Sequence, residues 1–98
     1  MVKIGIIGAG ELGQALGQVL SSSDAQIAYW DKDESQLLNL AGVSLAELME
    51  QSDFIFYCLP APALREALAF SAGYWRSGQI AVFFSKGLDP QTGKLAHE

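Results

Sequence analysis

The sequence predicts an α/β fold with a doubly wound parallel sheet, and three observations support this prediction. An apolar run at Val2–Ile7 is followed at once by closely spaced glycines and then by a helical pattern. Later apolar runs at 26–30, 54–59 and 80–84 are separated by helical patterns. Half of all residues are hydrophobic, as expected of parallel strands that helices cover on both faces.

The glycines after the first strand are Gly8, Gly10 and Gly13, at G-x-G-x-x-G spacing. The first glycine permits a sharp turn, the second lets the backbone approach a pyrophosphate, and the third lets the helix pack on the strand. A helix that begins near Gly10 presents unpaired N–H groups and the positive end of its dipole, which favours phosphate. The alternative is a glycine-rich turn without a ligand. Gly17, one turn further on, is interpreted as a packing glycine.

The apolar residues Leu12, Leu16, Val19 and Leu20 are spaced as in a helix, and a polar loop is predicted at 21–24. The second strand is predicted at Gln26–Trp30, with an acidic residue directly after it.

That acidic residue, Asp31, stands 18 residues after Gly13, close to the separation of about 20 at which a carboxylate reaches the adenosine ribose. A carboxylate there accepts hydrogen bonds from both ribose hydroxyls and repels a 2′-phosphate. The alternative is an acid that caps the next helix. Lys32 is a cation that could accept a 2′-phosphate. The pattern favours NAD over NADP, with NADP kept open.

The middle of the chain predicts short elements. A helix is expected from Glu34 to Leu40, ended by Gly42 in a left-handed cap. A very short edge strand follows at Val43. Ser44 and Glu47 fit a capping box that opens a helix to about residue 50.

The last part of the chain completes the sheet. A strand at 54–59 should lie on the other side of the first strand, because crossovers between parallel strands are right-handed. A helix from Pro62 to Ser71 follows, then a connector at 73–78 whose Tyr74 and Trp75 form a packed lid on the core. The final strand is 80–84, and the last residues begin another helix. Together these elements predict one Rossmann-type domain over residues 1–98, with about five strands in the order 3-2-1-4-5.

Three segments should converge at the carboxyl edge of this sheet: the glycine loop, residues 59–61 and residues 85–87. Lys86 could bind a substrate phosphate or hold a carbonyl oxygen there, or could be a solvated lysine. Cys58 lies in an apolar strand without a basic neighbour and is interpreted as a core residue. His97 has no partner in view. No set of metal ligands, Ser/His/Asp arrangement or pair of carboxylates on one face is present in the sequence.

Composition excludes several classes of function. The formal net charge is -5, without a basic run, which argues against nucleic acid and anionic membranes as partners. One cysteine cannot form an internal disulfide, so a cytoplasmic location is expected. No apolar run approaches the ~20 residues of a membrane span. The first strand begins at once, which leaves no room for a signal peptide.

Four stretches resemble one enzyme family: IGAGELGQALG at 7–17, YWDKD at 29–33, CLPAPALREAL at 58–68 and SKGLDPQTGKL at 85–95. They are similar to the N-terminal domain of NAD(P)-dependent glycerol-3-phosphate dehydrogenase. The resemblance implies hydride exchange between a nicotinamide and dihydroxyacetone phosphate or sn-glycerol 3-phosphate, with Lys86 in contact with cofactor and substrate. The expected cofactor site comprises Gly8, Ala9, Gly10, Glu11, Leu12, Gly13, Asp31, Lys32, Leu59, Pro60 and Lys86.

The chain departs from that family in three places. Glu11-Leu12 replace a small polar residue and Trp, the link from Asp31 to Phe54 is short, and the helical substrate domain is absent. On this basis the chain holds half an active site at most. Alternatives are the first domain of a β-hydroxyacid dehydrogenase, prephenate dehydrogenase or pyrroline-5-carboxylate reductase, or a stand-alone dinucleotide-binding module without catalysis. A second copy, in a homodimer, is a further expected partner.

Overall fold

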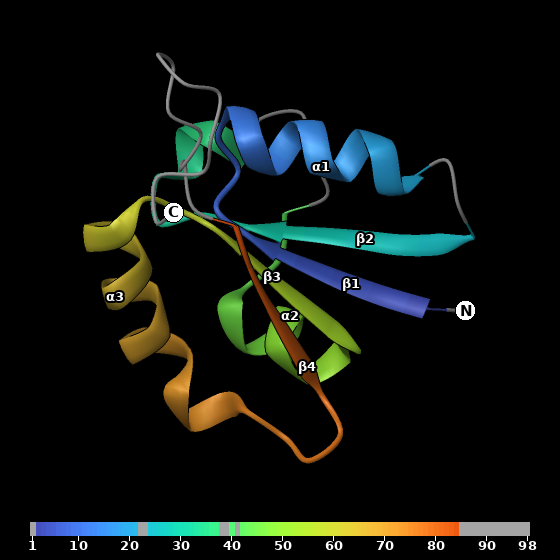
Figure 1. Cartoon of the computed structure of the whole chain (residues 1–98), viewed down its shortest axis with the longest axis vertical. Coiled ribbons are helices and arrows are strands. Elements are labelled where there is room, and N and C mark those ends of the chain that lie inside the picture. Colours follow the sequence, from blue (N-terminus) through green and yellow to red (C-terminus); the bar gives the residue numbers. More distant parts are fainter. Residues whose placement is uncertain (1, 22–23, 38–39, 41, 85–98) are drawn as a thin grey trace, which may run out of the picture.

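The computed structural model describes residues 2–21, 24–37, 40 and 42–84. Strands and helices alternate along this part of the chain (Figure 1). The strands are β1 (Val2–Ile7), β2 (Ala25–Trp30), β3 (Phe54–Cys58) and β4 (Ile80–Phe84). The α-helices are α1 (Glu11–Ser21), α2 (Leu45–Gln51) and α3 (Ala61–Ser71), and the 3₁₀ helices are η1 (Glu34–Leu37) and η2 (Ala72–Tyr74).

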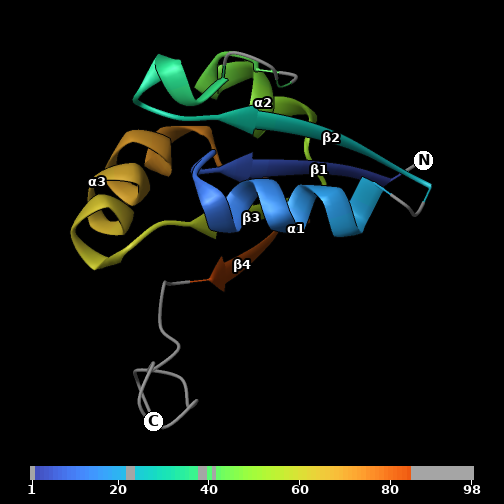
Figure 2. The same ribbon diagram turned by 90° about the horizontal axis from the view of Figure 1, so that it is seen from above.

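The strands form one parallel sheet in the order β2-β1-β3-β4 (Figure 2). In this register Ile6 of β1 lies between Tyr29 of β2 and Phe56 of β3. The chain builds outward from β1 to β2 and then returns to the other side of β1. The strand order therefore reverses at β1, which is the point at which open α/β sheets bind ligands, at the carboxyl ends of their strands.

The predicted strand order is confirmed, with one difference at the β2 edge. The third strand, predicted at Val43, is instead an isolated parallel bridge between Tyr29 and Gly42, next to a hydrogen bond from Val43 N to Tyr29 O of 3.0 Å. Ser44 already caps α2, so the extended segment has room for no more than this bridge.

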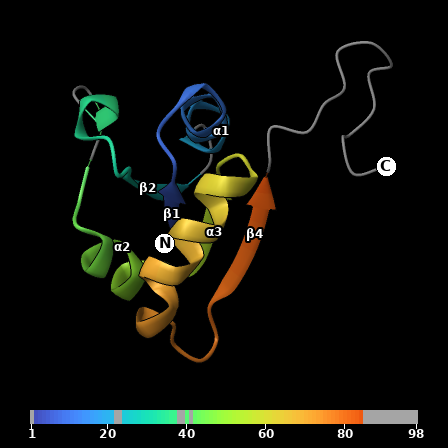
Figure 3. The same ribbon diagram turned by 90° about the vertical axis from the view of Figure 1, so that its left-hand side faces the viewer.

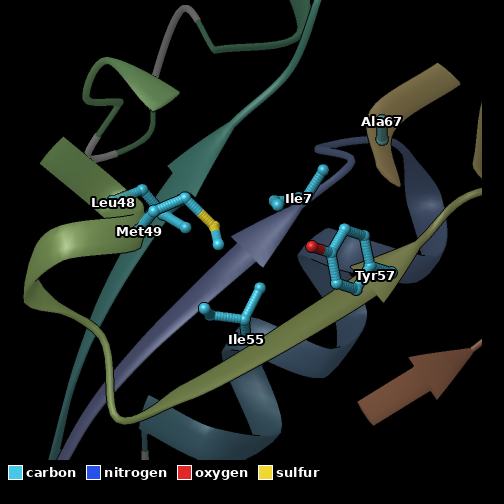
Figure 4. Close-up of a cluster of buried hydrophobic side chains, with 6 residues drawn as sticks. All are labelled: Ile7, Leu48, Met49, Ile55, Tyr57 and Ala67. Atoms are coloured by element: carbon cyan, nitrogen blue, oxygen red, sulfur yellow. The ribbon is translucent and has the colours of Figure 1, made fainter. Parts of the chain in front are cut away.

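Helices cover both faces of the sheet. Helix α1 lies on one face, and α2 lies on the opposite face together with α3 (Figure 3). A cluster of buried side chains joins the second face to these two helices (Figure 4). Its members are Ile7, Leu48, Met49, Ile55, Tyr57 and Ala67.

Helix α1 packs on the sheet through small residues. Gly13 and Gly17 are its buried positions, and a Cβ at Gly17 would overlap the hydroxyl group of Tyr29. This confirms Gly17 as a packing glycine. Of the helically spaced apolar residues, Leu16 and Leu20 pack against the core, whereas Leu12 is 38% exposed and Val19 is 69% exposed. The two glycines, four residues apart, turn toward the sheet and thereby rotate Val19 toward solvent.

The segment after β2 is shorter than predicted. In place of a helix over residues 34–40, the structure has the 3₁₀ helix η1, which ends at Leu37. Gly42 is not a left-handed cap, because the described residues with positive φ are Gly8 and Gly78. Instead, its backbone is extended alongside β2 in the bridge to Tyr29.

The predicted cap of α2 is confirmed, and α3 packs on the sheet through an apolar face. Ser44 Oγ accepts a hydrogen bond from Glu47 N at 3.1 Å. Leu64 and Leu68 pack on the core beside buried Ala67.

The predicted lid is half correct. Trp75 stacks on buried Tyr57 with ring centroids 6.3 Å apart, whereas Tyr74 is 45% exposed. Tyr74 and Trp75 are consecutive residues at the point where η2 ends and the backbone becomes extended. Of these two side chains, only that of Trp75 packs against the core.

The amino-terminal end of the sheet is closed by side chains that bind backbone groups. Asp53 Oδ2 accepts a hydrogen bond from Lys3 N at 2.9 Å. Gln79 Nε2 donates to Ser52 O at 2.9 Å and also to the carbonyl oxygen of Met49. Gln79 Oε1 accepts from Arg76 N at 2.7 Å. Side chains from the β3–β4 connection thus satisfy the carbonyl groups at the end of α2.

Two further expectations concern a membrane span and the last residues of the chain. No helix in the described ranges is long and apolar enough to cross a bilayer. The predictions for Lys86, His97 and the final helix fall on residues 85–98, outside the described residues.

Candidate functional site

The bend between β1 and α1 requires glycine at two positions. Gly8 has a φ of 105°, a conformation that other L-residues rarely adopt. A Cβ at Gly13 would overlap the carbonyl oxygen of Gly8. The start of α1 can therefore press directly on the bend only because Gly13 has no side chain.

The first turn of α1 leaves backbone donors available. The first α-helical hydrogen bond runs from Gln14 N to Gly10 O at 2.9 Å. Among the described residues, the amides of Gly10, Glu11, Leu12 and Gly13 have no protein acceptor. Unpaired N–H groups at the positive end of a helix form an anion-binding site.

Asp31 ties the end of β2 to the glycine bend. Its Oδ2 accepts a hydrogen bond from Ala9 N at 2.7 Å, and its Oδ1 accepts one from Asp33 N at 2.8 Å. Each carboxylate oxygen keeps a second lone pair, so both can accept one more hydrogen bond. The carboxylate orients the bend while remaining available to a ligand.

The acid that caps the following helix is Asp33 rather than Asp31. Asp33 Oδ1 accepts hydrogen bonds from Ser35 Oγ at 2.6 Å and from Ser35 N at 3.1 Å, at the start of η1. The side-chain hydrogen bond from Ser35 is the main cause that lowers the pKa of the Asp33 carboxyl group. Asp33 thus caps η1, whereas Asp31 in the same turn orients the glycine bend.

A cleft of about 680 Å³ opens in front of this bend, within the usual range of ~300–1,000 Å³ for ligand pockets. Its walls come from the start of α1, the end of β2 with the turn after it, and the segment at the end of β3. The lining residues are Gly10, Glu11, Leu12, Ala15, Asp31, Asp33, Gln36, Cys58, Leu59 and Pro60.

The structure thus brings together six of the predicted site residues: Gly10, Glu11, Leu12, Asp31, Leu59 and Pro60. Three others, Gly8, Ala9 and Gly13, are buried behind the cleft and shape the bend. Lys32 is not among the lining residues, and Lys86 lies outside the described part of the chain.

Besides Cys58, which was predicted to be a core residue, three residues of the cleft were not predicted from the sequence. Ala15 lies four residues after Glu11, so helical periodicity places both on one face and could have found it. Asp33 and Gln36 follow Asp31 in the same turn and η1. Nothing in their local pattern indicates which way their side chains face.

Lys32 forms an ion pair instead of facing the cleft. Its Nζ lies 2.9 Å from Glu66 Oε1 of α3, and the two side chains are 65% and 46% exposed. The ammonium group that could accept a 2′-phosphate thus has a carboxylate partner from a distant part of the chain.

Cys58 contributes to the floor of the cleft, yet its side chain is 6% exposed. Burial raises the pKa of the thiol to about 11, so the thiol is protonated at neutral pH and a poor nucleophile. This confirms its interpretation as a core residue. In the described ranges no three His, Cys, Asp or Glu side chains are grouped as a metal site would require.

Comparison with known proteins agrees with this geometry. Residues 1–69 match the family described as "D-isomer specific 2-hydroxyacid dehydrogenase, NAD binding domain". The chain belongs to this family. Those residues include the glycine bend, the turn after β2 and most of α3, so the chain is an NAD(P)-binding Rossmann domain.

Similar curated proteins are glycerol-3-phosphate dehydrogenases. The chain is 31% identical to "Glycerol-3-phosphate dehydrogenase [NAD(P)+] 2" of Lactobacillus delbrueckii subsp. bulgaricus over an alignment of 111 positions, which covers 94% of this chain and 33% of the relative. It is 29% identical to the enzyme of Bacillus velezensis, with 94% and 32% covered. The chain therefore spans about a third of the length of these relatives, and the predicted resemblance to their N-terminal part is confirmed.

A solved structure shows the same fold. It is described as a semialdehyde dehydrogenase NAD-binding protein from Cupriavidus necator in complex with calcium and NAD. The TM-score is 0.74 at 24% identity, over 86% of this chain and 33% of that chain.

Proposed function

We propose that this chain is the cofactor-binding part of an NAD(P)-dependent glycerol-3-phosphate dehydrogenase. In that role it holds the dinucleotide while a further domain supplies the rest of the substrate site. The bound nicotinamide would exchange a hydride with dihydroxyacetone phosphate or sn-glycerol 3-phosphate. The observation that carries this proposal is the row of amides at Gly10–Gly13 without an acceptor among the described residues, beside a cleft that Gly10, Glu11 and Leu12 line together with Asp31 and Pro60.

The proposed role of each segment follows from its chemistry. The amides of Gly10 to Gly13 would donate hydrogen bonds to the pyrophosphate oxygens. Asp31 would accept hydrogen bonds from the ribose hydroxyl groups, with its carboxylate already oriented by Ala9 N and Asp33 N. Leu59 and Pro60 would provide the apolar wall opposite. In this assignment Gly8 and Ala9 shape the bend, and Lys86 contacts cofactor and substrate.

The side chain of Glu11 fits this role as long as it points away from the phosphates. It belongs to the first turn of α1 and is exposed, so its carboxylate can turn toward solvent. Its backbone amide remains one of the unpaired donors.

A second candidate function is the cofactor domain of a dehydrogenase of 2-hydroxy acids, supported by the family match over residues 1–69. The alignments with the two glycerol-3-phosphate dehydrogenases described above each cover 94% of the chain. That greater coverage favours the first proposal.

Titration with NADH tests the cofactor role directly. The 98-residue chain is expected to bind NADH with weak to moderate affinity, followed by the fluorescence of the nucleotide. It should not oxidise NADH with dihydroxyacetone phosphate, because it spans only a third of the relatives. Absence of NADH binding would contradict the proposal, and so would turnover by the chain alone.

The reaction is tested on a chimera in which this chain replaces the corresponding third of the Lactobacillus delbrueckii relative. The chimera is assayed with NADH against dihydroxyacetone phosphate and against a 2-oxo acid. Oxidation with the triose phosphate alone supports the first proposal, whereas oxidation with the 2-oxo acid alone supports the second.

A further inference from the structure

The ion pair between Lys32 and Glu66 joins two segments beside the glycine bend. Lys32 follows β2 directly after Asp31, and Glu66 lies in the middle of α3. The residues are 34 positions apart in sequence, and their charged atoms are 2.9 Å apart. The pair therefore exists only because α3 packs beside the end of β2.

This pair lies at the border of the proposed cofactor site. Beside the main cleft is a small pocket of about 90 Å³, lined by Lys32 and Glu66 together with Gly8 and Asp31. Asp31 belongs to both pockets. A ligand group that reaches past Asp31 would therefore meet the ion pair next.

The charges of Asp31 and Lys32 act in opposite directions on a 2′-phosphate. The Asp31 carboxylate repels it, whereas the Lys32 ammonium would attract it, as an arginine does in NADP-binding sites. Glu66 holds that ammonium by a charge-assisted hydrogen bond. The lysine then has to give up this partner before it can bind a phosphate.

We propose that Glu66 is a specificity-determining residue, which favours NAD over NADP by keeping Lys32 away from the 2′ position of the ribose. This inference rests on the proposed cofactor role of the cleft. Both side chains are partly exposed, and exposed ion pairs are weak. The expected contribution is therefore small, about two- to fivefold in relative affinity.

The experiment compares NADH and NADPH titrations of the wild-type chain, Glu66→Gln, Lys32→Gln and the double variant. Glu66→Gln should bind NADPH about two- to fivefold more tightly and NADH unchanged. In the Lys32→Gln background, the same substitution should have no effect on NADPH. Glu50→Gln is the matched control, because it removes the same charge from α2, at the closed end of the sheet.

Three results would overturn the inference. A gain in NADPH affinity that persists without Lys32 would mean that Glu66 repels the phosphate directly. An equal gain with Glu50→Gln would mean that net charge alone is responsible. An unchanged NADPH affinity in Glu66→Gln would mean that the pair has no role in selection. If the wild-type chain binds neither nucleotide, the proposed function fails with the inference, whereas NADH binding without these effects contradicts the inference alone.

Discussion

The two ends of the sheet differ in whether their backbone groups have hydrogen-bond partners. At the amino-terminal end, Asp53 and Gln79 bind backbone groups that would otherwise lack partners. At the carboxyl-terminal end, the amides of Gly10 to Gly13 have no acceptor among the described residues, and Gly10, Glu11 and Leu12 line a cleft. One end contributes to the stability of the fold, and the other holds donors in place for a ligand.

This difference explains the distribution of glycine and side chains. The closed end depends on long side chains that reach across from the β3–β4 connection. The open end depends on the absence of side chains, since Gly8 and Gly13 let the backbone of the bend and helix approach each other. The comparison predicts that substitutions at the closed end change stability alone, and it can be tested at three positions.

The largest expected effect is that of Gly13→Ala, which lies at the open end yet should destabilise the fold. Its Cβ would overlap the carbonyl oxygen of Gly8, a backbone atom that can move only if α1 shifts. The free energy of unfolding should fall by about 3 kcal/mol, the upper range for overpacked sites. Urea denaturation followed by circular dichroism measures this change. An unfolding midpoint equal to that of the wild type would show that the bend adjusts without cost.

Gln79→Ala should give the next largest effect, on stability only. It removes the donor to Ser52 O and Met49 O and the acceptor for Arg76 N. These hydrogen bonds are exposed or half-buried. The free energy of unfolding is therefore expected to fall by about 2 kcal/mol. The same urea titration measures it, and the dissociation constant for NADH serves as the control. A weakened NADH affinity at full stability would contradict the separation of the two ends.

Gly10→Ala should show the converse, a loss of affinity without a loss of stability. A Cβ at this position meets no atom within 4 Å, and Gly10 lines the cleft. The added methyl group would occupy space that the pyrophosphate needs, so NADH affinity should fall about tenfold, which corresponds to about 1.4 kcal/mol. Fluorescence titration measures this loss beside an unchanged urea midpoint. Unaltered NADH binding would show that the phosphates do not approach Gly10.

Much of the fold could be predicted from local pattern. The strand at Val2–Ile7 and the bend at Gly8 follow from apolar runs and glycine sterics. The cap at Ser44 and the placement of Pro62 in the first turn of α3 follow from local hydrogen bonding and proline geometry. The same kind of reasoning failed for the segment after β2, where η1 is short and Gly42 is extended along β2. Pairing with Tyr29 decided that conformation, and the segment's own sequence does not show it.

By itself, the sequence determined the order of strands and helices, the glycine bend and the position of Asp31 at the end of β2, because these depend on neighbours within a few residues. Only the tertiary structure decided that Asp31 binds Ala9 N, that Glu66 holds Lys32, and that Gln79 closes the far end of the sheet. Each of these contacts joins residues more than 20 positions apart. Their formation depends on how the helices pack against the sheet, and no local periodicity or spacing specifies that packing.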